Sequence, residues 1–217
     1  MVNHYLSPGE QTQFTERVHE HAEKAKNIVI DDSEIGKLPG IQIPKDCELS
    51  IRRTCKYISK LPFIAGYNPS PKTENERKAN NQLKDSIFRQ RDLDQILKDG
   101  IYPTCSDTGV LFRGLMATQG HPTAYVETFH EGYIINGKPF STHAFGRVFF
   151  DGKSVIVNPE FKPIIFDSEV KIFPYIIFRE GLDSWDIGIR GYEDIHRLRR
   201  ENLIKLEKKR NHVIRCI

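Results

Sequence analysis

The stretch Ile101-Tyr-Pro-Thr-Cys-Ser-Asp-Thr-Gly-Val-Leu-Phe-Arg-Gly-Leu115 places a cysteine where a loop is expected to become a helix. Polar residues suited to a helix N-terminus surround it, and a glycine and a proline at 120 and 122 supply a stop. Apolar residues recur between these signals at close to the spacing of one helical face: Val110, Leu111, Leu115 and Met116. Cys105 is therefore predicted to lie at the start of a helix.

Three strands are predicted to follow this helix. Residues 123–129 are enriched in β-branched and aromatic types. Residues 143–150 and 154–157 form two further runs, joined by Asp151-Gly152, which is typical of a tight hairpin turn, and Asn136-Gly137 predicts an earlier turn. The first residue of one hairpin strand lies beside the last residue of the other. His143 and Asn158 are therefore expected to lie close together.

Cysteine, histidine and asparagine in this order suit nucleophilic catalysis. The thiolate is the useful nucleophile, whereas a free thiol is mostly protonated at neutral pH. A helix N-terminus favours the anion, and a nearby imidazole can take the proton to give a thiolate–imidazolium pair. An amide oxygen can accept the imidazole N–H and orient the ring. We expect Cys105 as nucleophile, His143 as base and Asn158 as the orienting residue.

Over roughly positions 80 to 190 the chain resembles the transglutaminase-like superfamily. The segments that carry the resemblance are Cys105-Ser-Asp, Ala117-Thr-Gln-Gly-His-Pro-Thr-Ala-Tyr-Val, His143-Ala-Phe and Phe150-Asp-Gly-Lys-Ser-Val-Ile-Val-Asn-Pro. Gly181-Leu-Asp-Ser-Trp-Asp-Ile-Gly-Ile is similar to a segment of bacterial and archaeal proteins that contain this domain. The resemblance implies an α+β fold with a papain-like core, in which N-terminal helices and a cysteine at a helix start pack on an antiparallel β-sheet.

The resemblance also implies roles for the three residues, one of which differs from the residue usual in the family. Cys105 corresponds to the family's nucleophile and His143 to its base, whereas Asn158 stands where an aspartate is usual. Each residue has a structural interpretation as well: cysteine is often a small buried hydrophobe, an isolated histidine is often structural, and Asn before Pro can simply end a strand. For Asn158 the two interpretations are balanced.

Only one of the two hydrogen-bond donors of an oxyanion site can be assigned from the sequence. The backbone N–H of Cys105 is a natural first donor, because it faces the carbonyl that the sulfur would attack. The second donor stays open. The candidates upstream are as well explained as surface or packing residues: Asn80, Asn81, Gln82 and Tyr102.

Two functions follow from these residues. The leading hypothesis is a cysteine-dependent acyl-transfer enzyme that acts on amide bonds, peptide or glutamine-like, through a thioester, with a protein or peptide as substrate. Hydrolysis is favoured over transfer to an amine, because water is always present. The competing hypothesis is a noncatalytic binding module on the same fold. No cofactor or metal is expected, because no metal-ligand spacing relates the four cysteines: Cys47, Cys55, Cys105 and Cys216.

Length and composition indicate one compact domain with elaborations, since 217 residues with 38% hydrophobic content can bury one sizeable core. We expect a helical extension at 1–74 packed on the core, the catalytic core at 75–190 and a basic helix at 191–217. Helices are predicted at 9–26, 49–61 and 79–99, and an edge strand at 171–178 because of Pro174. Trp185 either lines a cleft or anchors a loop.

The remaining expectations concern location and partners. The start of the chain has no basic segment followed by an apolar one, and no apolar run could span a bilayer, so a cytoplasmic protein with reduced thiols is expected and no membrane partner. The segment after Ile195 is basic, but the net charge is only +3 and no nucleic-acid module is recognisable. A solvated helix is therefore expected there, without a nucleic-acid partner. The oligomeric state is left open.

Overall fold

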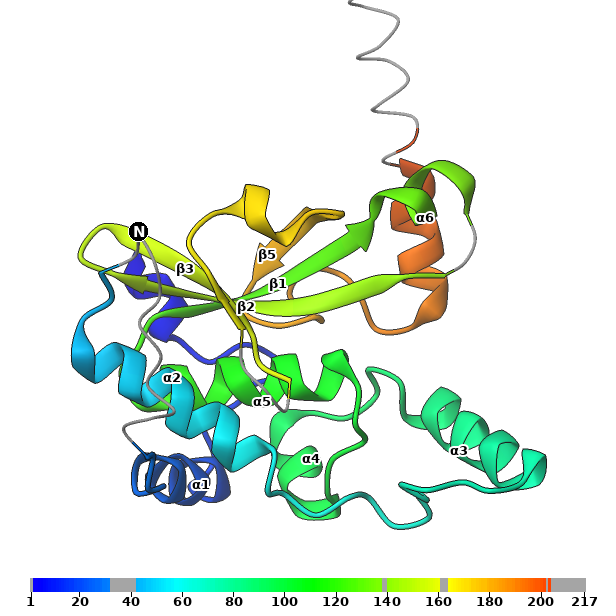
Figure 1. The fold of residues 1–217 in the computed structure, drawn as a ribbon, viewed down its shortest axis with the longest axis horizontal. Helices are drawn as coiled ribbons and strands as arrows, with labels where there is room; N and C mark the ends of the chain where they lie inside the picture. The colour runs from blue at the N-terminus through cyan, green and yellow to red at the C-terminus, as the bar shows by residue number, and fades with distance from the viewer. Residues whose placement is uncertain (1, 32–41, 138–139, 161–163, 202, 204–217) are drawn as a thin grey trace, which may run out of the picture.

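A five-stranded antiparallel sheet and a layer of helices on one of its faces form the architecture (Figure 1). The structure is a computed structural model that describes residues 2–31, 42–137, 140–160, 164–201 and 203. The strands are β1 (Thr123–His130), β2 (Thr142–Phe150), β3 (Lys153–Asn158), β4 (Ile164–Phe166) and β5 (Tyr175–Gly181), in the spatial order β4-β3-β2-β1-β5. The α+β class with helices packed on an antiparallel sheet is confirmed.

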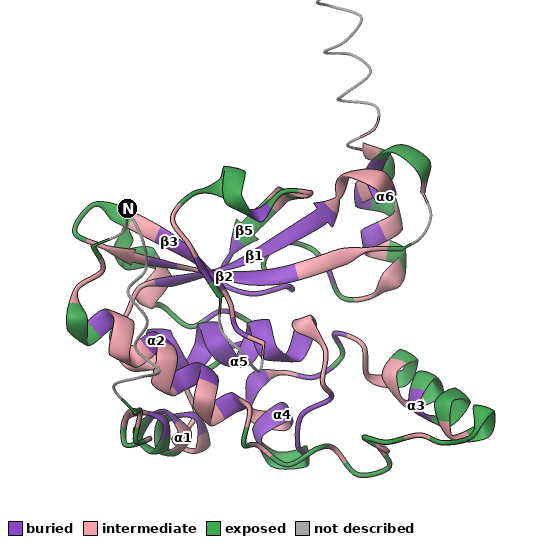
Figure 2. Ribbon diagram, viewed as in Figure 1, coloured by how far each residue is buried: buried purple, intermediate pink, exposed green. Residues whose placement is uncertain are grey.

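The helical layer is centred on one buried helix, α5. The helices on this side of the sheet are η1 (Val2–Leu6), α1 (Glu16–Lys26), α2 (Lys45–Ile58), α3 (Glu74–Ile87), α4 (Leu93–Asp99) and α5 (Cys105–Thr118). The short helices α6 (Glu131–Asn136) and η3 (Glu169–Ile172) lie on the other side of the sheet in Figure 1. α5 contacts β1 and β2 on one side and α1, α2 and α4 on the other. Figure 2 shows α5 buried along most of its length, whereas α3 extends away from the body and is largely exposed.

Two glycines let α5 approach the sheet closely. A Cβ atom at Gly146 on β2 would lie 2.4 Å from the ring of Phe112 on α5, and one at Gly109 on α5 would lie 2.9 Å from the ring of Tyr125 on β1. Real Cβ atoms do not approach other atoms so closely. The helix that begins at Cys105 is therefore held against β1 and β2 from its first turn onward.

Two helix predictions need correction. Residues 79–99 are not one helix, because the chain turns between α3 and α4: Arg89 has a left-handed φ of 57°, and Asp92 caps α4 by accepting from the Gln95 N–H at 2.7 Å. The predicted helix at 9–26 begins only at Glu16, after the cap Thr15. The helix predicted at 49–61 is α2, which starts and ends a few residues earlier.

The segment before α1 is held by long-range polar contacts instead of helical ones. Asp183 is fully buried and accepts from the Gln11 N–H at 2.9 Å and the Thr12 hydroxyl at 3.2 Å. Arg113 of α5, also fully buried, donates to the same Thr12 hydroxyl at 2.8 Å. The N-terminal segment is thus fastened to α5 and to the loop after β5.

The strand predicted at 171–178 starts later. η3 occupies its first residues, and β5 begins at Tyr175, directly after Pro174, which has no N–H to donate to a ladder. β5 does lie at an edge of the sheet, beside β1. Asn136-Gly137 ends α6, with Gly137 in the left-handed conformation, and Asp151-Gly152 makes the predicted hairpin turn with both φ values positive.

The C-terminal segment is described only in part. Residues 192–201 are helical and lie against α6, where Arg199 donates to the Tyr133 and Ile134 carbonyls at 2.7 and 2.9 Å. The rest of the predicted basic helix lies outside the described residues. Among the helices that the structure does describe, none is both long and apolar enough to cross a membrane. The division at residues 74 and 190 stays a prediction.

Candidate active site

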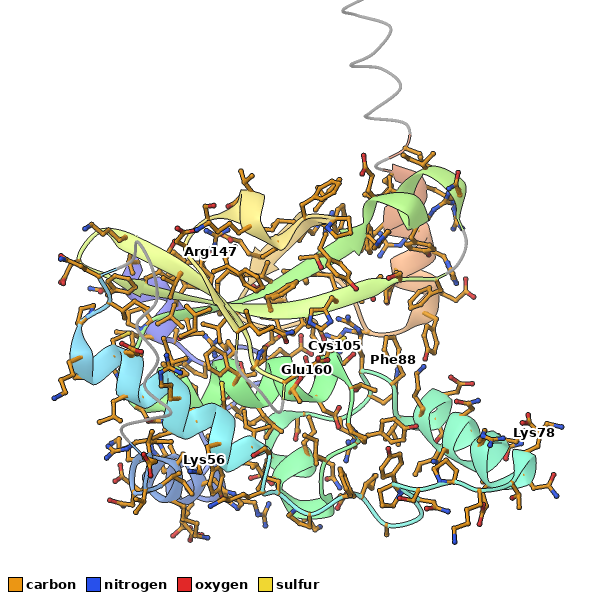
Figure 3. All side chains as sticks on the ribbon, viewed as in Figure 1. Lys56, Lys78, Phe88, Cys105, Arg147 and Glu160 are labelled. Carbon is orange, nitrogen blue, oxygen red and sulfur yellow. The ribbon has the colours of Figure 1, made fainter. Side chains whose placement is uncertain are left out.

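Cys105 is the first residue of α5. Its neighbour Thr104 is the N-cap, in an extended conformation with φ −125° and ψ 155°, and makes no side-chain capping hydrogen bond. The thiol is free and partly exposed. Figure 3 shows Cys105 at the end of α5 that lies beneath the sheet. Because the first N–H groups of a helix have no helical partner, the sulfur lies at a partly positive end of the helix dipole.

His143 and Asn158 come from the two strands of the hairpin. His143 is the second residue of β2 and Asn158 the last residue of β3, and 3.1 Å separates His143 Nε2 from Asn158 Oδ1. Since Oδ1 can only accept, Nε2 carries the proton of that bond and Nδ1 is left for the thiol. Cys105 lies close enough to His143 for its thiol to raise the pKa of the imidazole. The structure therefore brings the three predicted residues together in the order Cys105, His143, Asn158.

The surroundings of His143 favour its protonated form. Burial alone lowers the pKa of His143, but the hydrogen bond and the charge of Cys105, with smaller contributions from Asn158 and Glu160, outweigh burial and raise that pKa to about 9. The rings of Phe145 and Tyr175 lie against the imidazole, with centroids 4.5 and 5.5 Å away. These surroundings therefore favour the imidazolium form of His143 at neutral pH.

Asp107 organises the loop that leads to Cys105. Its carboxylate accepts from the Tyr102 N–H at 2.9 Å and pairs with Arg91, which also donates to the Gly100 carbonyl at 2.8 Å. Burial raises the pKa of Asp107 to about 6, against the opposing effects of Arg91 and the Tyr102 N–H. The sequence indicated only a residue suited to a helix N-terminus, and its partners across the loop were not predicted.

A buried ion pair lies close to Cys105 and was missed from the sequence. Arg89 Nη2 is 2.7 Å from Glu127 Oε2, and the side chains are 1% and 0% exposed. The Tyr125 hydroxyl donates to the same oxygen at 3.0 Å. The sequence did contain a clue: Glu127 is the only charged residue in the predicted strand 123–129. Because side chains alternate between the faces of a strand, Glu127 lies on the same face as Tyr125.

The four candidates for a second oxyanion donor do not converge on the sulfur. Asn81 and Gln82 are exposed on α3, the helix that leaves the body. The side chain of Asn80 bonds to the backbone of Asn68, and the Tyr102 hydroxyl donates to the Asn80 carbonyl at 3.1 Å. These contacts give Asn80 and Tyr102 structural roles.

Trp185 and the carboxylates beside it anchor a loop. The indole N–H donates to the Arg89 carbonyl at 2.8 Å, and the Arg190 guanidinium lies 4.7 Å from the ring centroid. Asp183 and Asp186 accept backbone N–H groups of the same loop. Over the part of the chain that the structure describes, no three His, Cys, Asp or Glu side chains gather as a metal site would require.

Comparison with known proteins adds little to this geometry. No protein-family model matches the chain, and no curated protein matches it. A crystal structure of a candidate cysteine protease from Cytophaga hutchinsonii is similar, with 15% sequence identity and a TM-score of 0.46 over 85% of this chain. The matched region is 48% of that protein, so this chain spans about half of its length.

Proposed function

We propose that the protein is a cysteine-dependent acyl-transfer enzyme that acts on amide bonds of a protein or peptide. One observation supports this most directly: the imidazole of His143 is hydrogen-bonded to the amide oxygen of Asn158 and lies close enough to the thiol at the start of α5 for that thiol to raise its pKa. This is the relation that a nucleophile, a base and an orienting group need. The transglutaminase-like, papain-like assignment of the core belongs to the same proposal.

The proposed reaction has two halves. In the first, the Cys105 sulfur forms a bond to the substrate carbonyl carbon, the C–N bond breaks, and the His143 imidazolium gives its proton to the departing amine. The oxyanion that forms in between faces the backbone N–H of Cys105 at the helix start. In the second half, His143 takes a proton from water as the water oxygen attacks the thioester, which releases the acid and returns the thiolate–imidazolium pair.

Water is the proposed acyl acceptor. An amine could attack the same thioester and give transamidation, but it would need a site that holds it while water is kept out. The described part of the chain offers no assigned amine site, whereas water reaches a partly exposed cysteine without one. Hydrolysis is therefore the proposed outcome, and an added primary amine would compete with it.

The first test uses the cysteines of the chain as references for one another. We expect Cys105 to react with iodoacetamide at pH 6 far faster than an ordinary thiol, whose pKa is about 8.5. Cys47 and Cys55 should stay unlabelled in the folded protein, because both are buried and burial raises the pKa of Cys47 to about 12. Peptide mass spectrometry after timed labelling measures each site separately. Ordinary, slow labelling of Cys105 would favour the noncatalytic binding module.

A second prediction concerns Asn158. Asn158→Ala removes the acceptor that holds the His143 ring, so alkylation of Cys105 at pH 6 should slow by about tenfold, as expected for loss of a hydrogen bond to a charged group. Because that bond raises the pKa of His143, the midpoint of His143 titration followed by NMR should move down in Asn158→Ala. In Asn158→Asp it should move up, because the acceptor then carries a negative charge. Equal midpoints in the three proteins would exclude the orienting role.

A further inference from the structure

Of the five side-chain nitrogen and oxygen atoms of Arg89 and Glu127, three make no hydrogen bond among the described residues. Arg89 Nε and Nη1 and Glu127 Oε1 are buried without a partner among the described residues, although one bond joins Arg89 Nη2 to Glu127 Oε2. A buried charge that is only partly paired costs free energy. Such a cost within a core commonly marks a functional requirement.

Arg89 lies near the residues on either side of the nucleophile. Arg89 lines a cavity of about 10 Å³ together with Thr104 and Ser106, the two residues that flank Cys105. Its guanidinium carbon is 5.9 Å from the centroid of the Tyr125 ring, the same ring that leaves no room for a Cβ at Gly109, one helical turn after the nucleophile. Arg89 therefore lies near the start of α5, beside the residues that flank the nucleophile.

The backbone around Arg89 fixes its place. Its φ of 57° lies in the left-handed region, which is costly for a residue other than glycine. The Trp185 N–H bond to its carbonyl and the stack of Phe88 on Tyr192, with centroids 4.0 Å apart, hold this turn. The turn that interrupts the predicted helix at 79–99 therefore positions the Arg89 guanidinium beside Glu127 and Tyr125.

We propose that Arg89 is a positioning residue for the acyl-transfer reaction: its partly paired guanidinium stabilises the negative charge of the Cys105 thiolate from within the core, and Glu127 limits that effect. This inference depends on the proposed function, because it concerns the same nucleophile. In a buried, low-dielectric setting a cation acts over several ångströms without contact. In this proposal His143 and Arg89 both stabilise the charge on the sulfur.

The charges around Arg89 are consistent with this role. Burial lowers the pKa of Arg89, but Glu127 and Tyr125, with a smaller contribution from Cys105, raise it above its ordinary value. Because the interaction between two charges is mutual, a cation at Arg89 that is stabilised by an anion at Cys105 also stabilises that anion. The other titratable or charged groups near the start of α5 are His143, Glu160, Tyr125, Glu127, and the pair Arg91 and Asp107. Lys84 and Tyr102 line the same cavity as Arg89, and Tyr192 stacks on Phe88 beside it.

The test is a pair of substitutions that should shift the pH midpoint of Cys105 alkylation in opposite directions. Arg89→Gln leaves Glu127 as an unbalanced anion, so the midpoint of the pH–rate profile for iodoacetamide alkylation of Cys105 should rise, with alkylation at pH 6 slowed by about tenfold. Glu127→Gln leaves Arg89 as an unbalanced cation, so the midpoint should fall. A purely structural pair would give shifts of the same sign, or none, in both variants, and either result would overturn the proposal.

Two conservative variants keep the test decisive if a glutamine variant does not fold. Arg89→Lys keeps the positive charge and should keep the wild-type midpoint, while Tyr125→Phe removes one hydrogen bond from Glu127 and should raise it slightly. If the midpoint of Arg89→Lys rises as much as that of Arg89→Gln, or if the midpoint of Tyr125→Phe does not move, the result counts against the proposal. Arg113→Gln is the matched control, because Arg113 is equally buried on α5 but bonds to Thr12 and Thr123, remote from Cys105.

The same experiment separates this inference from the proposed function. If wild-type Cys105 shows an ordinary thiol profile that His143→Ala does not change, the proposed enzyme itself is excluded. If the wild-type profile is activated and depends on His143, but the Arg89 and Glu127 variants do not diverge, only the role of Arg89 fails.

Discussion

In His143→Ala, alkylation of Cys105 at pH 6 should slow by one to two orders of magnitude. An ordinary thiol with a pKa of about 8.5 holds only about 0.3% thiolate at pH 6, so loss of the imidazolium partner should move the sulfur toward that population. Part of the loss is recovered, because a more basic thiolate is a better nucleophile. Timed iodoacetamide labelling with peptide mass spectrometry gives the rate constant.

The pH dependence supplies the control. Since the pKa of His143 is raised to about 9, the imidazolium form persists from acid up to about pH 9. In the wild type, acyl transfer that needs its proton should fall only above that pH. In His143→Ala, alkylation should instead keep rising with pH and approach the wild-type rate above about pH 9, where an ordinary thiol is ionised. A variant that labels as fast as the wild type at pH 6 would contradict the pairing of Cys105 with His143.

The largest effect on stability is expected from Asp183→Ala. The carboxylate of Asp183 accepts four hydrogen bonds, from the Gln11 N–H, the Thr12 hydroxyl and the N–H groups of Trp185 and Asp186. Alanine would leave these buried donors unpaired and would remove a negative charge that raises the pKa of Arg113, against the dominant lowering effect of burial. The free energy of unfolding should fall by about 3–5 kcal/mol, as measured by urea denaturation.

Glu10→Ala provides the comparison for Asp183→Ala. Glu10 pairs with Arg190 at 2.6 Å, but the two side chains are 61% and 52% exposed. An exposed pair contributes at most about 1 kcal/mol, so this variant should unfold close to the wild type. If Asp183→Ala were no more destabilised than Glu10→Ala, the N-terminal segment would not be fastened to the core as its contacts indicate.

Much of the secondary structure could be predicted because its signals are local. The start of α5, the Asp151-Gly152 turn and the hairpin of β2 and β3 depend on residues a few positions apart, and each was predicted with small errors at the ends. The same locality placed His143 and Asn158 at one end of the hairpin. The prediction failed for residues 79–99, because the left-handed turn at Arg89 is stabilised by Trp185, which is 96 positions away.

The sequence by itself therefore determined the α+β class, the helix that begins at Cys105 and the strands that carry His143 and Asn158. Only the tertiary structure decided which buried polar and charged groups meet: Arg89 pairs with Glu127 across 38 positions, and the Gln11 N–H donates to Asp183 across 172. The reason is physical. Helix and hairpin patterns are encoded in hydrogen bonds and apolar spacing between near neighbours, whereas a buried ion pair exists only once the packing of separate elements has excluded water and brought the two charges within reach of each other.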